Sequence, residues 1–529
     1  MINHKVLRSI SALLLCVCAA SALALDGAVP AIHGDVSRNL LGNGTGVIIG
    51  IVDSGVDDLH PTLAGLDSLG SPRMVAESNF VTSEPGNTGD DVFGHGTWVA
   101  SAALGSAATF TGMATDARYV NARVLNNSNG FPNDTPVRNG LGFAINQGAN
   151  VVNLSLNFAG TNSGGFSQLD LMVDWAAFDR RINCAVCVGN ISQASSASNL
   201  VRGPGSAFNG VTVGRTTADF TQVHPDSATA FTSFPNRMKP DVVAPGAALT
   251  LANDDWEGAA ADWDMNLGGC SFATPLVAGL MAQQIEAGMT HGHSADPLVV
   301  KATMMNSAAK VLDKQGNAWE PSLSSNNGGL ITAIQSLDNH SVAGQVDGNA
   351  LATQYLAGEK TPGFVDPIGW DFNVISAVQA IDYVIDPNLI LGSTLSATLT
   401  WYRHVGRTDN GNGIVDANDT FFQQQTLSNL DLQVLRNGLP VAQSISTIDN
   451  VEHLFLSVDQ SAQYTLRVFG ENILGAGEEF ALAWHSVAVP EPASFLLLAI
   501  AAVGAFVVCH RSRHLAMTSC EPVPVLVQR

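Results

Sequence analysis

The sequence predicts an α/β protein with a doubly wound parallel sheet, followed by a smaller all-β sandwich domain. Three continuous apolar runs, each followed by polar or glycine-rich residues, are typical of strands that a parallel sheet buries on both faces: 47–52, 151–154 and 184–188. The stretches 141–147 and 166–180 between them have the pattern of helices that cover such a sheet. Because ligands bind at the carboxyl ends of the strands in this architecture, we expect a functional site there.

After residue 387 the hydrophobic period changes to two, which is typical of strands that are buried on one face only. Apolar and polar side chains alternate in five segments, 395–401, 430–434, 454–458, 464–468 and 480–484. Together these segments predict a β-sandwich. We therefore divide the body of the chain into an α/β domain at 25–360 and a sandwich domain at 365–487.

The first residues have the features of a signal peptide. Lys5 and Arg8 precede an apolar run at 10–20, and Ala22-Leu23-Ala24 supplies the small residues that a signal peptidase needs. The run is shorter than the roughly 20 residues that span a bilayer, although a membrane anchor is the alternative interpretation. The sequence therefore predicts a signal peptide at 1–24 and an exported protein.

The C-terminal end predicts a membrane segment within a sorting signal. Residues 493–509 carry no charge and are just long enough to span a bilayer, and Arg511 and Arg513 follow them. With Val489-Pro490-Glu491-Pro492 directly before this run, residues 489–514 resemble the PEP-CTERM sorting signal of Gram-negative bacteria. The resemblance implies transient anchoring in the inner membrane, processing by an exosortase-type enzyme, and a final location at the cell surface or outside the cell. A plain transmembrane anchor is the alternative.

Charge and cysteine content exclude some classes of partner and of fold. The chain has 24 Lys and Arg against 46 Asp and Glu, a net charge of -22, so nucleic acid is not an expected partner. Three cysteines fall in the predicted body, Cys184, Cys187 and Cys270. Cys184 and Cys187 lie about 10 Å apart along a strand, too far to bridge, so we interpret them as small buried hydrophobic residues. We expect no disulfide framework.

Three short segments each carry a side chain of a Ser-His-Asp enzyme. Asp53 follows a buried strand, and His95 lies in Gly94-His95-Gly96-Thr97 at the start of a predicted helix. Ser271 lies at a glycine-flanked helix start, where backbone N–H groups and the helix dipole stabilise an oxyanion. Taken alone, each segment also fits a structural turn or a helix cap. The order Asp, His, Ser is nevertheless that of subtilisin.

Around these segments the chain resembles the subtilisin-like serine peptidases, the subtilases, from about residue 47 to 307. Further segments that carry the resemblance are Val152-Asn153-Leu154-Ser155-Leu156, Val188-Gly189-Asn190 and Lys239-Pro240-Asp241-Val242-Val243-Ala244-Pro245-Gly246. The resemblance implies that Ser271 is the nucleophile, His95 the general base and acid, Asp53 the group that orients His95, and Asn190 a donor to the oxyanion. It further implies that the substrate binds at four residues, Ser155, Leu156, Asn157 and Gly189.

The chain departs from the family at several of these positions. The family usually has Thr and Met on either side of the nucleophile, where this chain has Cys270 and Phe272, and Gly where it has Asn157. We expect the Cys270 thiol to point into the core rather than to act as a nucleophile. The function that the sequence predicts is an exported serine endopeptidase that acts on proteins or peptides through an acyl-enzyme. A non-catalytic surface or matrix protein with the same fold and an acid peptidase of the sedolisin type are the alternatives.

No cofactor is required for that chemistry, but one loop suggests calcium. Residues 408–419 partly resemble an EF-hand or dockerin loop, with four oxygen-bearing side chains in ligand register, Asn410, Asn412, Asp416 and Asp419. Thr408 occupies the first ligand position, where Asp is expected. A calcium site and a polar hairpin loop are therefore alternatives.

Overall fold

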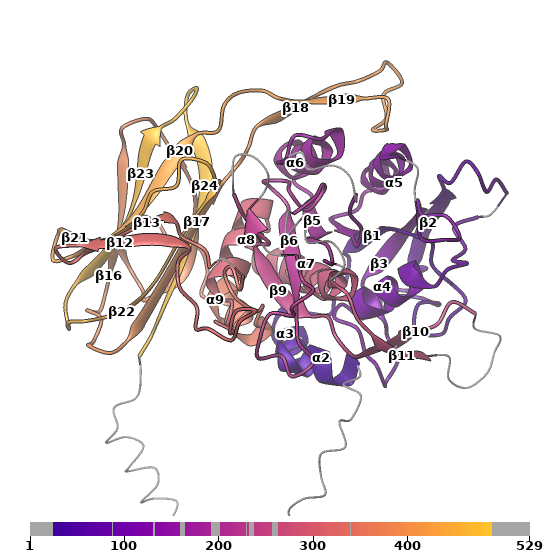
Figure 1. The fold of residues 1–529 in the computed structure, drawn as a ribbon, viewed down its shortest axis with the longest axis horizontal. Coiled ribbons are helices and arrows are strands. Elements are labelled where there is room, and N and C mark those ends of the chain that lie inside the picture. The colour runs from indigo at the N-terminus through magenta and orange to yellow at the C-terminus, as the bar shows by residue number, and fades with distance from the viewer. Residues whose placement is uncertain are drawn as a thin grey trace, which may run out of the picture.

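The computed structural model describes residues 25–488 except 87, 131–132, 159–163, 192–200, 229, 232–236, 256–262 and 339. The described chain forms an α/β domain and a β-sandwich that lie side by side (Figure 1). The predicted signal peptide and the predicted sorting segment, with its membrane segment at 493–509, lie outside the described residues. Within the described part of the chain, none of the helices combines the length and the apolar character that a membrane crossing requires.

The first domain is built on a sheet of seven parallel strands in the order β2-β3-β1-β4-β5-β6-β9. Their bounds are β2 (Met74–Asn79), β3 (Arg118–Arg123), β1 (Ile48–Asp53), β4 (Val151–Leu154), β5 (Asn183–Cys187), β6 (Val211–Thr216) and β9 (Val242–Pro245). The three apolar runs form β1, β4 and β5, the adjacent strands at the middle of the sheet. The predicted parallel α/β fold is therefore confirmed.

Helices cover both faces of this sheet (Figure 1). On one face lie α2 (Leu25–Ala31), α3 (Gly34–Leu41), α4 (His95–Leu104) and α7 (Cys270–His291), and on the other lie α5 (Thr135–Asn146) and α6 (Gln168–Arg180). Alternate residues of β1 serve the two faces: Ile49 and Ile51 join the apolar core of α4 and α7, whereas Val52 joins the core of α5 and α6. This two-sided burial explains why the strands have continuous apolar runs.

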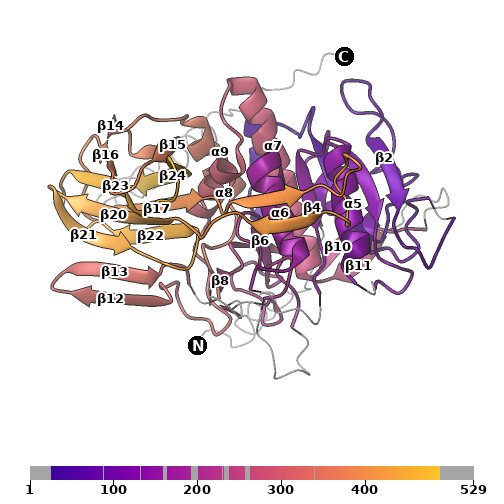
Figure 2. The ribbon, with the colours of Figure 1, turned by 90° about the horizontal axis from the view of Figure 1, so that it is seen from above.

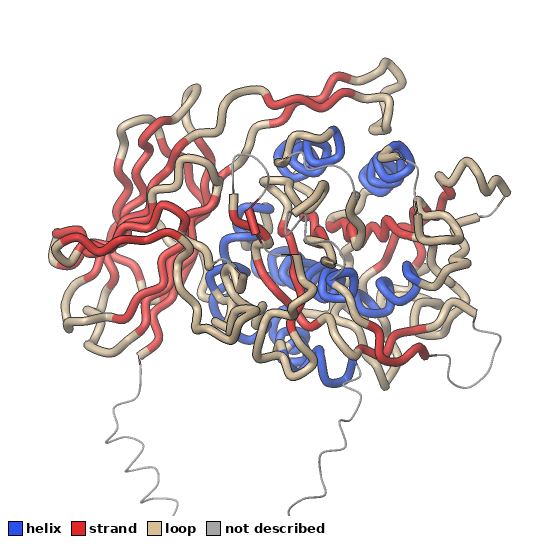
Figure 3. Tube along the Cα trace, in the orientation of Figure 1, coloured by secondary structure: helices blue, strands red, loops and turns tan. Residues whose placement is uncertain are grey.

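The second domain is a sandwich of strands, and Figure 3 shows that the helices lie around the first domain. One sheet has the order β12-β13-β21-β20-β23-β16-β14, and the other has the order β15-β24-β17-β22. The bounds are β12 (Leu323–Asn327), β13 (Leu330–Gln335), β14 (Gly363–Val365), β15 (Ile368–Ile375), β16 (Ala380–Ile385), β17 (Thr394–Trp401), β20 (Asn429–Arg436), β21 (Leu439–Ser444), β22 (Val451–Ser457), β23 (Tyr464–Asn472) and β24 (Glu478–Val487). The five alternating segments all form strands of this sandwich.

The structure differs from the single domain boundary that we predict between 360 and 365. The hairpin of β12 and β13 lies within the range assigned to the first domain, yet β13 pairs in parallel with β21, with Ile331 opposite Ala442. The polar strand β12, Leu323–Asn327, has no apolar alternation that would identify it as part of a sandwich. This pairing joins segments that are far apart in the sequence, which local periodicity does not report.

Two helices connect the domains. The sheet that contains β17 and β24 packs on α8 (Pro297–Asn306) and α9 (Gly348–Leu356). A shared apolar cluster includes Val299 of α8, Tyr355 of α9 and Trp370 of β15. The sandwich is therefore packed against the first domain by a continuous hydrophobic interface.

A two-stranded ribbon extends from the sandwich across the first domain. It consists of β18 (Val405–Thr408) and β19 (Thr420–Gln423), and it lies over α6 and α5 in both views (Figures 1 and 2). The side chain of Gln168 in α6 bonds the backbone N–H and the carbonyl of Phe421. Smaller pairs of strands complete the fold, β7 (Ala230–Phe231) with β8 (Met238–Lys239) and β10 (Leu249–Ala252) with β11 (Trp263–Leu267).

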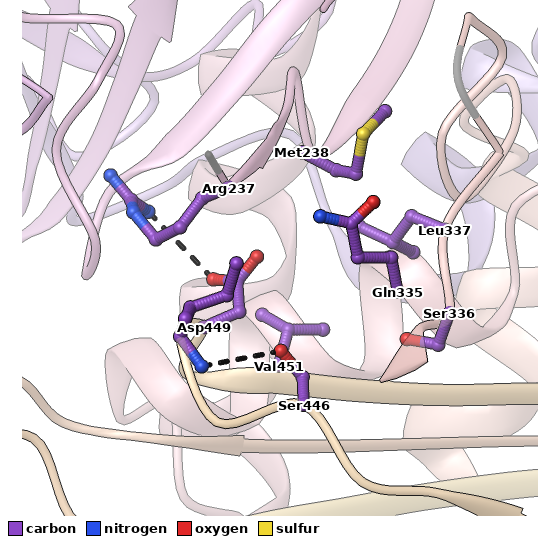
Figure 4. A pocket seen from close by; sticks show the side chains of 9 residues that line it. Arg237, Met238, Gln335, Ser336, Leu337, Ser446, Asp449 and Val451 are labelled. Carbon is purple, nitrogen blue, oxygen red and sulfur yellow. Dashed lines mark hydrogen bonds and ion pairs between the residues drawn. The ribbon is translucent and has the colours of Figure 1, made fainter. Parts of the chain in front are cut away.

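A small pocket lies where the two domains meet (Figure 4). Arg237 lines it from the first domain and pairs with Asp449 of the sandwich at 3.7 Å. Gln335 and Ser446 also line it, and none of the predicted site residues is among its walls. This pocket is therefore a feature of the domain interface, and the candidate active site lies elsewhere.

Candidate active site

Asp53 and His95 are in direct contact. Asp53 is the last residue of β1, its side chain is completely buried, and His95 is the first residue of α4. The Nδ1 atom of His95 lies 2.6 Å from Oδ1 of Asp53, an oxygen that also accepts a hydrogen bond from the N–H of Ser54 at 2.8 Å. With Nδ1 engaged by the carboxylate, the other ring nitrogen, Nε2, is left to exchange protons with a substrate or a nucleophile.

Two glycines allow the strand end and the helix start to approach. A Cβ atom added to Gly96 would lie 1.9 Å from the carbonyl oxygen of Gly55. Gly94, the residue before the helix, has a φ of 95°, a left-handed conformation that favours glycine. The glycines on either side of His95 are thus needed to bring the imidazole to the end of β1.

Asp91 forms hydrogen bonds at the start of α4, although no sequence motif indicated this residue. Its Oδ2 atom accepts hydrogen bonds from the N–H and the hydroxyl of Thr97, at 2.9 and 2.8 Å. Its Oδ1 atom accepts from the hydroxyl of Ser54 at 2.9 Å and from the N–H of Gly94 at 3.0 Å. A buried carboxylate at the start of α4 satisfies N–H groups that have no partner within the helix. The signal that could have found Asp91 is its position four residues before His95.

The surroundings of His95 favour its protonated form. Burial by itself lowers the pKa of the imidazole, but the Asp53 carboxylate and its hydrogen bond more than offset that effect, with a smaller contribution from Asp91. The net result is that the pKa of His95 is raised above its ordinary value. This is the electrostatic arrangement that stabilises an imidazolium formed when a histidine accepts a proton.

Ser271 is the second residue of α7 and is largely buried, with 9% of its surface exposed. The next side chain, Phe272, places its ring 5.6 Å from the imidazole ring of His95. Among the described side chains, Ser271 and His95 are not joined by a hydrogen bond. The structure therefore brings the serine segment against His95 at the start of a helix, where the dipole is positive.

Asn190 lies beside the serine segment. The backbone N–H of Cys270 donates a hydrogen bond to Oδ1 of Asn190 at 3.0 Å. With its oxygen engaged in this way, the amide directs its Nδ2 donors elsewhere. Asn190 is exposed, so these donors can reach a bound molecule.

The expectation of unpaired cysteines is wrong for two of the three. Cys187, the last residue of β5, and Cys270, the first residue of α7, form a disulfide with Cα atoms 5.6 Å apart. Cys184 is free and buried, as the interpretation as a small hydrophobic residue requires. The pair was missed because 83 positions separate the two cysteines, and sequence spacing does not report their distance in space.

The four predicted substrate residues lie near the same segments. The hydroxyl of Ser155, just after β4, donates to the backbone carbonyl of Ser271 at 2.7 Å and so links the two segments. Leu156 is buried with 6% of its surface exposed. A Cβ atom on Gly189 would lie 2.8 Å from Nδ2 of Asn157, so the departure from glycine at 157 puts an amide against Gly189.

The candidate calcium loop is held by its own side chains and by an arginine. The carboxylate of Asp416 accepts hydrogen bonds from the side-chain amides of Asn410, Asn412 and Asn418. Asp419 is paired with Arg407 at 2.8 Å. In the described part of the chain, no three His, Cys, Asp or Glu side chains converge in a way that could hold a metal ion.

Comparison with known proteins identifies the class of protein. Residues 44–329, more than half of the chain, match the model of the subtilase family, and residues 488–512 match the PEP-CTERM protein-sorting motif. The first match covers the parallel sheet, Asp53, His95, Asn190 and Ser271. The chain therefore belongs to the subtilase family of serine endopeptidases.

Individual relatives resemble about half of the chain. The chain is 29% identical to thermitase of Thermoactinomyces vulgaris over 282 residues, which cover 53% of this chain and 86% of thermitase. It is 30% identical to alkaline serine exoprotease A of Vibrio alginolyticus over 280 residues, 52% of this chain and 45% of the relative. Subtilisin E of Bacillus subtilis strain 168 is 30% identical over 243 residues, 45% of this chain and 55% of the relative. The chain thus spans about half the length of the last two relatives.

Proposed function

We propose that this protein is an exported serine endopeptidase that cleaves peptide bonds through an acyl-enzyme on Ser271. The observation that carries the proposal is the contact between buried Asp53 and His95 at 2.6 Å, at the carboxyl edge of the sheet and against the serine segment. In this mechanism His95 accepts the proton of the Ser271 hydroxyl as the oxygen attacks the substrate carbonyl. His95 then gives the proton to the leaving amine, and water releases the acyl group by the same steps.

Stabilisation of the oxyanion is assigned to Asn190 and to the start of α7. The Nδ2 group of Asn190 and the backbone N–H of Ser271 would donate hydrogen bonds to the tetrahedral oxygen. Ser155, Leu156, Asn157 and Gly189 would bind the substrate chain beside β4 by strand pairing. None of these steps needs a cofactor, and calcium at 408–419 would have no part in them.

Chemical labelling of the serine tests this function directly. A fluorophosphonate should modify Ser271 in the purified full chain, and peptide mapping should locate the label there. Ser271→Ala removes only a hydroxyl, so the variant should stay folded but lose both labelling and casein hydrolysis. The expected loss in kcat is about 10⁶-fold, the size of the effect in subtilisin. A folded wild-type chain that neither labels nor hydrolyses casein would favour the alternative, a non-catalytic surface protein.

The C-terminal segment gives a second proposal, on export. The matched sorting motif supports cleavage near Pro490 to Pro492 by an exosortase-type enzyme, after transient anchoring through 493–509. A plain anchor would not need the Pro-Glu-Pro element. The intact mass of the mature protein from its native host decides between the two. A surface or extracellular species that still contains 493–529 would contradict processing, and Ser271→Ala should be processed like the wild type.

A further inference from the structure

The disulfide lies directly beside the two groups that are assigned to the oxyanion. Cys187 is three residues before Asn190, and Cys270 is the residue before Ser271. We infer that the Cys187–Cys270 bond positions Asn190 relative to the backbone N–H of Ser271, so that both cysteines are positioning residues for the reaction. This inference rests on the proposed function, because it concerns the geometry of that same site.

Two hydrogen bonds connect the same two segments as the disulfide does. The N–H of Gly189 donates to the sulfur of Cys270 at 3.2 Å. The N–H of Cys270 donates to Oδ1 of Asn190 at 3.0 Å. The covalent bond and these two hydrogen bonds therefore join residues 187–190 to Cys270, the residue before Ser271.

The bond is buried, whereas the amide that it positions is exposed. Cys187 and Cys270 are 1% and 0% exposed, and they form a small apolar cluster with Val188, Val201 and Ala228. Asn190 lies at the surface, where water competes for the part-buried hydrogen bond between its side chain and the N–H of Cys270. A covalent link below the surface restricts the motion of the two segments more than this part-buried hydrogen bond does alone.

Precise placement matters for this kind of group. Donors to an oxyanion lower the barrier because they are already oriented when charge develops, and a misplacement of about 1 Å can cost about 10²-fold in rate. A loss of the disulfide should therefore appear in kcat rather than in KM. A disulfide also suits an exported protein, because oxidising compartments preserve such bonds.

A different role for the bond is stabilisation of the fold as a whole. Cys184 provides a matched control, because it is a free cysteine on the same strand, β5, and is also buried. It belongs to another apolar cluster, with side chains of α5 and α6, and it is not part of the disulfide. Cys184→Ala removes a sulfur from the same strand without breaking the disulfide.

The experiment begins with proof of the bond and of activity. A peptide map of the full-length protein without reductant should contain one fragment that joins Cys187 to Cys270. The wild type should label with a fluorophosphonate at Ser271 and hydrolyse a peptide substrate taken from a casein digest. Failure of labelling or hydrolysis overturns the proposed function itself, and a map without the linked fragment overturns only the disulfide inference.

Kinetics of the cysteine variants then test positioning. We expect Cys187→Ala, Cys270→Ala and the double variant each to lose kcat by about 10- to 100-fold, with KM within about twofold of the wild type. Either substitution breaks the one disulfide, and Cys270→Ala also removes the sulfur that accepts a hydrogen bond from the N–H of Gly189. Cys184→Ala should keep kcat within about twofold. Circular dichroism checks that each variant is folded.

A double-mutant cycle tests whether the disulfide acts through Asn190. In an Asn190→Ala background, Cys187→Ala should lower kcat by less than about threefold, because the amide that the disulfide positions is already absent. A loss that is as large as in the wild-type background would overturn the inference. So would full activity of the folded double cysteine variant, or a loss in the double variant that equals the sum of two independent losses.

Discussion

At the scale of single residues, a few small contacts decide where the reactive side chains lie. Gly94 and Gly96 allow α4 to approach the end of β1, and Asp91 satisfies the N–H groups at the start of the helix. The sequence indicated Asp53, His95 and Ser271 because each lies in a short motif with its glycines. It did not indicate Asp91, because the local signal of this carboxylate is its position four residues before His95, and that position is not specific to this role.

Asn190 gives the first prediction at this scale. Asn190→Ala should lower kcat by about 10² to 10³-fold, the size of the corresponding effect in subtilisin, because the amide bonds the oxygen chiefly in the transition state. KM should change little. Steady-state kinetics on a peptide substrate measures both constants. A change confined to KM would show that the amide instead contacts the substrate in its ground state.

The pH dependence of catalysis is the second residue-scale prediction. The Asp53 carboxylate, acting against burial, raises the pKa of His95, so kcat/KM should fall on the acid side with an apparent pKa above about 6.5. Protonated His95 cannot accept the serine proton, which is why activity is lost below the raised pKa and present above it. The rate of fluorophosphonate labelling should follow the same curve.

The raised pKa of His95 also affects the stability of the fold, but the stabilising contribution is present at low pH, where catalytic activity is lost. A histidine whose pKa is raised in the folded state stabilises the fold fully below its unfolded pKa, about 6.5, and this contribution disappears as pH rises through the folded value.

For the catalytic prediction, a fall of kcat/KM on the acid side with an apparent pKa at or below about 6.5 would contradict the assignment of His95 as a base paired with Asp53.

At the scale of elements, the first domain follows from its hydrophobic pattern and the ribbon does not. Continuous apolar runs predicted β1, β4 and β5, because burial on both faces leaves the strands no polar side. Residues 408–419 suggested either a calcium loop or a polar hairpin from composition alone. In the structure this loop reaches α5, where the side chain of Asn146 bonds the backbone of Val415 in both directions.

The ribbon loop gives a prediction about metal removal. Arg407 already supplies positive charge to Asp419 at 2.8 Å and to Asp409 at 3.3 Å, and asparagine amides bond Asp416. We therefore expect a calcium chelator to shift the melting temperature of the full chain by less than about 1 °C, which is about 1 kcal/mol for a chain of this size. The Asp416→Ala variant serves as the control, because a chelator effect that it abolishes would assign the ion to this loop.

At the scale of the whole molecule, buried charges join the two domains. Arg403, from the segment between β17 and β18, is 1% exposed and pairs with the fully buried Asp174 of α6 at 3.1 Å. The guanidinium groups of Arg403 and Arg237 both lie over the ring of Phe208, at 4.7 and 3.3 Å from its centroid. The guanidinium of Arg403, from the sandwich, thus neutralises the Asp174 carboxylate inside the first domain.

Arg403 gives the prediction for this interface. Burial raises the pKa of Asp174, and Arg403 counteracts that effect, so Arg403→Met leaves a buried carboxyl without its cation. The free energy of unfolding should fall by about 3–5 kcal/mol, as measured by urea denaturation of the full chain. Arg467→Met, which breaks a part-exposed pair with Asp382 on the sandwich, should cost less than about 1 kcal/mol. Equal losses in the two variants would argue against a structural role for the buried pair.

The sequence by itself determined the fold class, the order Asp53, His95, Ser271, and the sandwich strands with period two. These features depend on residues that are close in the sequence, where strand burial, glycine turns and helix starts leave a local pattern. Only the tertiary structure decided the Cys187–Cys270 bond, the pairing of β13 with β21, and the insertion of Arg403 beside Asp174. Each of these joins positions from 83 to more than 200 residues apart, and such distances are set by how the layers pack, which no local period encodes.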